Sequence, residues 1–183
     1  MTERRAGWLR VIATIDKFTD VFSAVASGII LVLVLIVTYE VAARYLFHAP
    51  TRWAFDMTYM IYGTFFMLGA AYALRRGAHI RTDLLWAMLS PRWRAAIDFT
   101  AYVLFFFPAI SLLFLTSVDD AWHSWVIGER SEQSSWRPYL FIFKSMMPLA
   151  LFLLLVQGIA ELLKSWYAIL RNEPYAEEEK IEI

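Results

Sequence analysis

The stretch VFSAVASGIILVLVLIVTY, residues 21–39, decides the fold class because it is long, apolar and free of charged side chains. An α-helix needs about twenty such residues to cross the roughly 30 Å hydrocarbon core of a bilayer. Three further stretches are similarly apolar, so four spans are expected, over about 21–44, 53–75, 95–118 and 139–163. Hydrocarbon offers no partner to a free backbone N–H or C=O group, so each span is predicted to be helical.

The composition agrees with an integral membrane protein. Of the 183 residues, 60% are hydrophobic, whereas roughly 45–50% is typical of a soluble domain. The 17 basic and 17 acidic residues cancel, so net charge indicates no strongly charged partner. The absence of cysteine from the sequence excludes disulfides, thiolate metal sites and thiol catalysis. The predicted fold class is therefore all-α, with four transmembrane helices and accompanying interfacial amphipathic helices.

Polar tails are predicted on both sides of the membrane domain. Residues 1–20 are expected to form a cytoplasmic tail with an interfacial helix, because apolar side chains recur there at helical spacing opposite Arg10, Asp16 and Lys17. A polar segment before the first apolar run favours an uncleaved helix over a signal peptide. Residues 21–166 form the predicted membrane domain, and 167–183 an acidic cytoplasmic tail.

The distribution of Lys and Arg predicts the orientation. Twelve of these residues lie in the two tails and the second loop, whereas four lie in the first and third loops. Cytoplasmic loops carry the excess of basic residues, so both termini are predicted to be cytoplasmic.

Local signals predict where helices begin and bend. In the second loop, Thr82 or Asp83 can cap a short interfacial helix. Ser90 and Pro91 are typical of the N-cap and first residue of a helix, here the third span. Proline removes a backbone donor, so Pro108 and Pro148 are expected to kink their spans or loosen their hydrogen bonding.

Ionisable residues in or near the spans are the functional candidates, because charge in a bilayer is costly. Toward the outer face, Glu40 and Arg44 are four residues apart and can pair on one helix face. Asp56 is the predicted partner of Lys144. A second predicted layer at the inner face contains Arg75, Arg76, Asp98 and Glu161. No acidic residue lies mid-span, so we interpret both layers as ties between helix ends; a conduction path is the alternative.

Catalytic patterns are not recognisable, and the chain is predicted not to be an enzyme. The histidines at 48, 79 and 123 fall in loops or at span ends, which does not suit haem ligation between facing helices. Phosphate-binding loops, nucleophile elbows and metalloprotease helices are missing from the sequence. No cofactor or metal is expected, and the basic second loop is explained by orientation rather than by nucleic acid binding.

Four sequence strings together resemble a known family. They are RYLFHAPTRWAFD (44–56), LGAAYALRRGAHIRTDLL (68–85), FFFPA (105–109) and WRPYLFIFKSMMPLALFLLLVQGIAE (136–161). In order and spacing, over roughly residues 20–166, the chain is similar to the small integral-membrane (Q) subunit of tripartite ATP-independent periplasmic (TRAP) transporters. Asp56 occupies a position where that family more often has glutamate.

The resemblance and the charge pattern together select candidate residues for subunit or helix-packing interfaces. These are Glu40, Arg44, Pro50, Trp53, Asp56, Gly69, Arg75, His79, Asp83, Asp98, Lys144, Pro148 and Gln157. In the third loop, mixed charge and aromatic side chains are typical of a protein interface, although an interfacial aromatic belt explains the tryptophans equally well. The candidates for periplasmic contact there are Trp122, Trp125, Glu129, Arg130 and Trp136.

What the resemblance implies is a three-part importer in the bacterial inner membrane. A periplasmic binding protein captures an organic acid, a large membrane subunit carries it with Na⁺ in an elevator motion, and the small subunit widens the static scaffold within the lipid bilayer. The Na⁺ and substrate sites then belong to the large subunit, so no substrate, metal or cofactor site is expected in this chain. Two alternatives are a self-sufficient channel or exporter that uses Glu40 or Asp56, and the membrane anchor of a redox complex.

Overall fold

The computed structural model of the protein describes residues 2–76 and 89–171, and within these ranges it is helical without a strand. The elements are α1 (Thr2–Tyr45), α2 (Ala54–Arg75), α4 (Pro91–Ala101), a π-helical turn η1 (Tyr102–Phe106), α5 (Phe107–Ile127) and α6 (Phe141–Arg171). Within the described residues, four helical stretches are long and apolar enough to span a membrane: Arg10–Tyr45, Ala54–Arg75, Arg92–Ile127 and Phe141–Leu170. The predicted fold class of four membrane-spanning helices is confirmed.

The helix limits differ from the predicted boundaries at both tails. A single unbroken helix, α1, contains both the predicted interfacial segment and the first span. No proline or glycine lies between Trp8 and Ser27, so nothing in the sequence ends the helix near residue 20. At the other tail, α6 continues through Arg171 for the same reason. The start of the predicted second-loop helix, at Thr82 or Asp83, and the interface candidates His79 and Asp83 lie outside the described residues.

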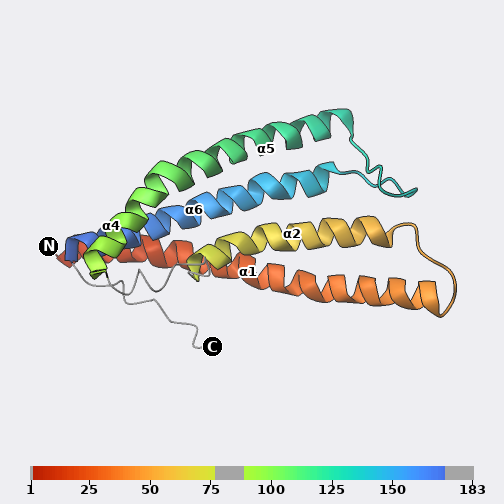
Figure 1. Cartoon of the computed structure of the whole chain (residues 1–183), viewed down its shortest axis with the longest axis horizontal. Coiled ribbons are helices and arrows are strands. Elements are labelled where there is room, and N and C mark those ends of the chain that lie inside the picture. Colours follow the sequence, from red (N-terminus) through yellow and green to blue (C-terminus); the bar gives the residue numbers. More distant parts are fainter. Residues whose placement is uncertain (1, 77–88, 172–183) are drawn as a thin grey trace.

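The four spans lie side by side in an open layer (Figure 1), in the order α5, α6, α2, α1. Helix α6 is central, because it contacts α5, α4, α2 and α1. The buried share of its most apolar segment is 28%, against 6% for α1 and for the α4–α5 span. Large apolar side chains are exposed along all four spans, as expected of helices that meet lipid or another membrane subunit rather than water.

The small buried core joins α1, α2 and α6 near the centre of the layer. Its buried residues are Ala26, Leu68, Ala71, Ala150 and Leu153, with Phe22, Ile29, Phe65, Met67 and Leu154 packed around them. Alanines in this core let the helix backbones approach closely, which is how helices associate where burial from water does not drive them together.

Helix α4 begins as the sequence predicts, with Ser90 in extended conformation (ψ 153°) before Pro91. The predicted loosening at Pro108 is confirmed, because the π turn η1 ends directly before α5, with Pro108 in the first turn of that helix. A π turn shifts hydrogen bonding to wider spacing, which accommodates a proline that lacks an N–H group. Helix α6 runs through Pro148 without a break.

Two glycines allow aromatic rings to pack against helix backbones. A Cβ atom at Gly158 would lie 2.4 Å from Cε1 of Phe106, and one at Gly63 would lie 2.8 Å from Cε2 of Phe143. By contrast, a Cβ atom at Gly28 or Gly69 would meet nothing within 4 Å. The latter two glycines therefore leave a helix face open within this chain.

Candidate functional site

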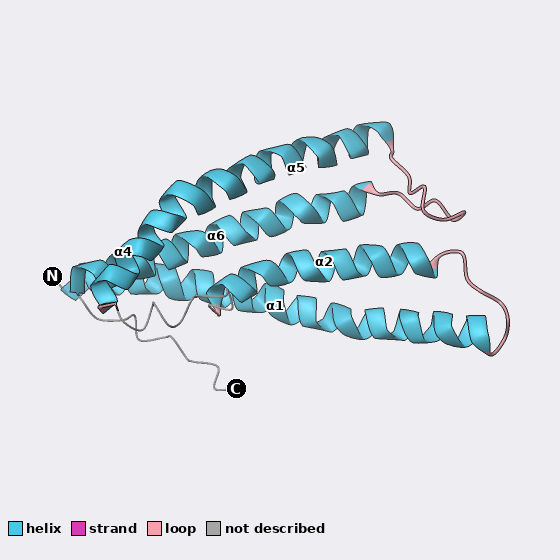
Figure 2. Cartoon of the chain, viewed as in Figure 1, coloured by secondary structure: helices cyan, strands magenta, loops and turns pink. Residues whose placement is uncertain are grey.

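Polar contacts gather at the two opposite ends of the helix layer. We call the end where α1 begins and α6 ends the terminus end, and the end with the α1–α2 and α5–α6 loops the loop end (Figure 2). At the terminus end, polar contacts join helices α1, α2 and α6 to one another, whereas at the loop end polar contacts hold loops against helices.

A buried polar network, the terminus cluster, joins three helices. Its members are Asp16, Thr19 and Asp20 of α1, Arg75 of α2, and Gln157, Glu161 and Lys164 of α6. Gln157 is fully buried at its centre. Its amide nitrogen donates to Oδ1 of Asp16 at 2.9 Å and to Oε1 of Glu161 at 3.0 Å, while its amide oxygen accepts from Thr19 Oγ1 at 2.7 Å. All the polar atoms of this side chain are thereby used.

The charges of the terminus cluster converge on Asp16, whose exposed fraction is only 3%. Lys164 Nζ lies 3.1 Å from Oδ2 of Asp16 and 2.9 Å from Oε1 of Glu161. Arg75 Nε lies 3.6 Å from Oδ1 of Asp16, and the same guanidinium pairs with Asp20. A buried carboxylate with two cationic partners on two other helices fixes the relative position of α1, α2 and α6.

This arrangement corrects the prediction that Asp16 lies on the polar face of an interfacial helix. The error has a readable cause: Ile12, Asp16, Thr19 and Ala26 are all buried and follow one another at spacings of four, three and seven residues. Those spacings trace one side of a helix, so Asp16 shares a face with apolar residues.

Two members of the predicted inner layer, Arg75 and Glu161, belong to the terminus cluster. The Nε atom of Arg76 donates to the Tyr72 hydroxyl at 3.0 Å. Asp98 lines a groove on the face of the layer. The joining of all four residues in one layer stays a prediction.

At the loop end, the predicted pair of Glu40 and Arg44 is confirmed, with Nη2 of Arg44 2.6 Å from Oε1 of Glu40. The second carboxylate oxygen of Glu40 accepts from the backbone N–H of Thr51 at 3.1 Å and from its hydroxyl. Nearby, the rings of Tyr39 and Trp53 stack with centroids 6.0 Å apart. Glu40 thus holds the α1–α2 loop, which includes Pro50, against the end of α1.

The predicted pair of Asp56 with Lys144 is wrong. Lys144 Nζ lies 2.8 Å from Oε2 of Glu129 and 3.1 Å from Oδ1 of Asp120, so its partners come from α5 and the residues that follow it. The hydrogen bond from Lys144 lowers the pKa of Glu129, which lies outside the spans. Asp56, with an exposed fraction of 1%, instead accepts hydrogen bonds from the hydroxyls of Ser131 and Ser134.

Residues 128–140 form a closed loop that we call the α5–α6 hairpin. Gly128, with φ at +60°, ends α5 in the left-handed conformation that glycine favours. The N–H of Ser131 donates to the carbonyl of Pro138 at 2.8 Å, and the N–H of Leu140 donates to the carbonyl of Glu129 at 2.9 Å. These bonds define a short antiparallel pairing that carries the chain from α5 to α6.

Of the predicted periplasmic contacts, three already have partners within the chain. Arg130 donates to the Tyr139 hydroxyl at 2.5 Å and lies 4.1 Å from that ring's centroid, while Glu129 pairs with Lys144. Trp125 donates to Ser145 at 3.0 Å but remains 55% exposed. Of the three tryptophans, Trp122 is the most exposed, at 71%, and Trp136 is 45% exposed. Contact with a periplasmic protein stays a prediction for all five.

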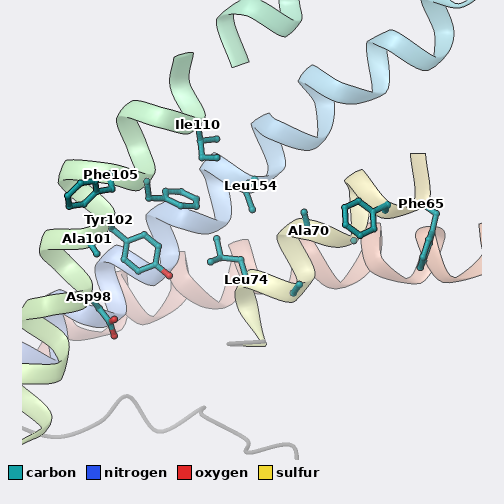
Figure 3. Close-up of a pocket in the computed structure, with 13 residues that line it drawn as sticks. Phe65, Ala70, Leu74, Asp98, Ala101, Tyr102, Phe105, Ile110 and Leu154 are labelled. Carbon is teal, nitrogen blue, oxygen red and sulfur yellow. The ribbon is translucent and has the colours of Figure 1, made fainter. Parts of the chain in front are cut away.

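One groove of about 910 Å³ opens on the face of the layer between α2 and the α4–η1–α5 segment, with Leu154 of α6 also lining it (Figure 3). Most of its lining is apolar and includes Gly69, Phe65 and Phe105. Figure 3 places Asp98 at one end of the groove, near Tyr102. The predicted interface residues Gly69 and Asp98 therefore lie in one surface feature.

Metal binding has no support within residues 2–76 and 89–171, where no three His, Asp or Glu side chains are placed to hold an ion. Within the described residues, four helices are long and apolar enough to cross a membrane, which is the architecture of a multi-pass helical membrane protein.

Residues 33–168, most of the chain, match the family model of the DctQ component of tripartite ATP-independent periplasmic transporters. The chain belongs to this family, as its resemblance to the small TRAP subunit predicts. No individual curated protein gives a significant match to the chain. Asp16, Thr19 and Asp20 of the terminus cluster precede the matched region, whereas Arg75, Gln157, Glu161 and Lys164 lie inside it.

Proposed function

We propose that this chain is the scaffold subunit of a TRAP transporter in the bacterial inner membrane, where it supports a large, Na⁺-coupled subunit. The transporter takes up an organic acid that a periplasmic binding protein delivers. Family membership makes the chain a component of a TRAP transporter. The proposal places both termini, and with them the terminus end, on the cytoplasmic side, so the loop end faces the periplasm.

The observation that carries the proposal is that polar contacts join helices to one another at one end of an apolar layer and hold loops against helices at the other end. At the terminus end, three helices share the buried amide of Gln157. At the loop end, Glu40 and Asp56 each hold a loop against a helix. Such a layer resists relative movement of its helices, which suits a static support better than a moving carrier.

The geometry disfavours a self-sufficient channel or exporter. Glu40 is occupied by Arg44 and Thr51, and Asp56 is buried beneath two serine hydroxyls. Both acids lie at the loop end, far along the layer from the terminus cluster, with the apolar core of Ala26, Leu68 and their neighbours between. A coupling acid has to exchange its ion with both sides of the membrane, and neither residue is placed for that.

The faces of the layer supply the proposed contact with the large subunit. Gly28 and Gly69 have open space where a side chain would stand, and Gly69 lines the groove. Small residues on an open helix face allow a neighbouring transmembrane helix to approach closely.

Crosslinking tests this proposal directly because the chain has no native cysteine. A single Gly69→Cys variant, co-expressed with the large subunit of its transporter, is expected to crosslink to that subunit in native membranes. Ala150→Cys, at a buried position of the core, is the matched control and is expected to give no intersubunit product. A chain that purifies only as a homo-oligomer, without the large subunit, would contradict the scaffold function.

A further inference from the structure

Asp56 is a buried carboxylate that takes part in no ion pair with the residues that the structure describes. It lies at the start of α2, yet its hydrogen-bond donors come from a loop far along the sequence. Ser131 Oγ donates to Oδ1 at 2.6 Å, and Ser134 Oγ donates to Oδ2. The carboxylate therefore bridges two positions of the α5–α6 hairpin.

Through each of these serines, Asp56 also orients the backbone of the hairpin. The hydroxyl of Ser131 accepts the N–H of Gln133 at 3.2 Å, and the hydroxyl of Ser134 accepts the N–H of Trp136 at 3.2 Å. A hydroxyl has one proton to donate and two lone pairs to accept with. Because Asp56 takes both protons, the lone pairs are turned toward the backbone, and the turn that carries Trp136 is fixed.

The hairpin that Asp56 holds is an outward-projecting surface. It follows the end of the third span at Ile127 and precedes the fourth span at Phe141, and it extends beyond the ends of α5 and α6 (Figure 2). Glu132, Gln133 and Arg137 are exposed there beside the indole of Trp136. This mixture of two charge signs, an amide and an aromatic ring suits a folded, water-soluble protein better than lipid hydrocarbon.

Arg137 adds an independent sign that the hairpin is held in one conformation. Its φ is +50°, a region that non-glycine residues adopt at a cost and that clusters at binding sites and switches. The carbonyl of Arg137 lies 3.4 Å from Nη1 of Arg130, which helps to hold the strained turn. A loop already fixed in its bound shape loses less conformational entropy on binding.

We infer that Asp56 is a positioning residue that fixes the α5–α6 hairpin for docking of the periplasmic binding protein. Its own side chain is buried and does not touch that protein. The docking step rests on the proposed function, whereas the control of hairpin conformation does not. The complementary surface on the binding protein would offer an apolar recess for Trp136 and charged groups opposite Glu132 and Arg137.

The test compares Asp56→Asn with the matched variant Asp20→Asn at the terminus end. Each variant is purified with its large subunit in lipid nanodiscs. Hydrogen exchange of residues 128–140 is measured first, and the affinity for the binding protein second. An amide donates where Asp56 accepts, so Asp56→Asn is expected to speed exchange across the hairpin and to weaken binding about tenfold, the effect of one lost hydrogen bond. Asp20→Asn is expected to change neither.

Double substitution separates positioning from general damage. If Asp56 acts through the hairpin, Asp56→Asn costs little further affinity once Trp136→Ala has removed the contact. Unchanged hairpin exchange in Asp56→Asn would overturn the positioning role. Faster exchange with unchanged affinity would show that docking does not use the hairpin. Failure of the unmodified complex to bind any binding protein would instead count against the proposed function and the docking step together, while the exchange result would still judge Asp56.

Discussion

The two ends of the helix layer contain similar polar and charged side chains, but these side chains stabilise different parts of the structure. At the terminus end, one connected and buried network joins three helices through Gln157 and Asp16. At the loop end, the acids act in separate groups, and Glu40 and Asp56 each hold a loop. The comparison indicates that the terminus cluster sets how the helices pack, whereas the loop-end groups set the shape of the surface beyond the spans.

The largest effect is expected at the terminus cluster. Asp16→Ala removes the buried partner of Lys164 and Arg75, and loss of one member of a buried ion pair costs about 3–5 kcal/mol. The loss should appear as a lower unfolding free energy when the protein is unfolded with increasing concentrations of a denaturing detergent. Asp20→Ala is the matched control, because the Asp20 side chain is 48% exposed and its removal should cost far less. Equal losses of unfolding free energy in the two variants would show that Asp16 is not the centre of the terminus cluster.

A second prediction compares two glycines in the apolar layer. Gly158→Ala places a methyl group against the ring of Phe106, and overpacking of this kind costs about 1–3 kcal/mol. Gly69→Ala meets open space and should raise the unfolding free energy of the isolated chain by about 0.5–1 kcal/mol, because alanine loses less backbone entropy in a helix than glycine does. The combination of Gly158→Ala with Phe106→Leu should recover part of the loss. If Gly69→Ala destabilises the isolated chain as much as Gly158→Ala does, the space beside Gly69 is not open.

A third prediction concerns the partners of Lys144 at the loop end. In a double-mutant cycle, Lys144→Met and Glu129→Gln should be coupled by about 0.5–1 kcal/mol, the range for partly exposed pairs. Lys144→Met and Asp56→Asn should be additive in the same unfolding measurement, because Asp56 is bound to serines. Strong coupling between Lys144 and Asp56 would restore the pairing that the sequence suggested.

The smallest effect is a pH dependence of the Glu129 contact. Lys144 lowers the pKa of Glu129 from its ordinary value of 4.5. A carboxyl with a lowered folded-state pKa contributes stability above its ordinary pKa and loses it as the pH falls through the lowered value. The stability difference between the natural chain and Glu129→Gln should therefore be constant from pH 7 to about 5 and shrink in stronger acid. A difference that grows on acidification would contradict this sign.

Sequence reasoning was sufficient where the determining interaction is local. The four spans follow from runs of apolar residues, the start of α4 from Ser90 and Pro91, and the contact of Glu40 with Arg44 from a spacing of four residues. The family motifs added the class of protein, which composition alone did not identify.

The sequence did not predict contacts in which a side chain has several possible partners that lie far apart along the chain. Lys144 could reach an acid on any neighbouring helix, and its choice of Glu129 depends on how α5 ends beside α6. Ser131 and Ser134 gave no signal because serine is ordinary in a loop. Asp16 was placed on the wrong face because Ile12 fits both the interfacial pattern and the buried one. In that case the helical spacing of Asp16, Thr19 and Ala26 would have revealed the second face.

Transport in proteoliposomes distinguishes a scaffold subunit from a self-sufficient carrier. This chain, the large subunit and the binding protein are reconstituted together and in each incomplete combination, under an inward Na⁺ gradient or a matched K⁺ gradient. If the chain is a scaffold, organic acid is taken up only with all three proteins and with Na⁺, and neither acid nor protons pass through this chain alone. Uptake or proton flux by the chain alone, abolished by Glu40→Gln or Asp56→Asn, would show that the chain is itself a carrier.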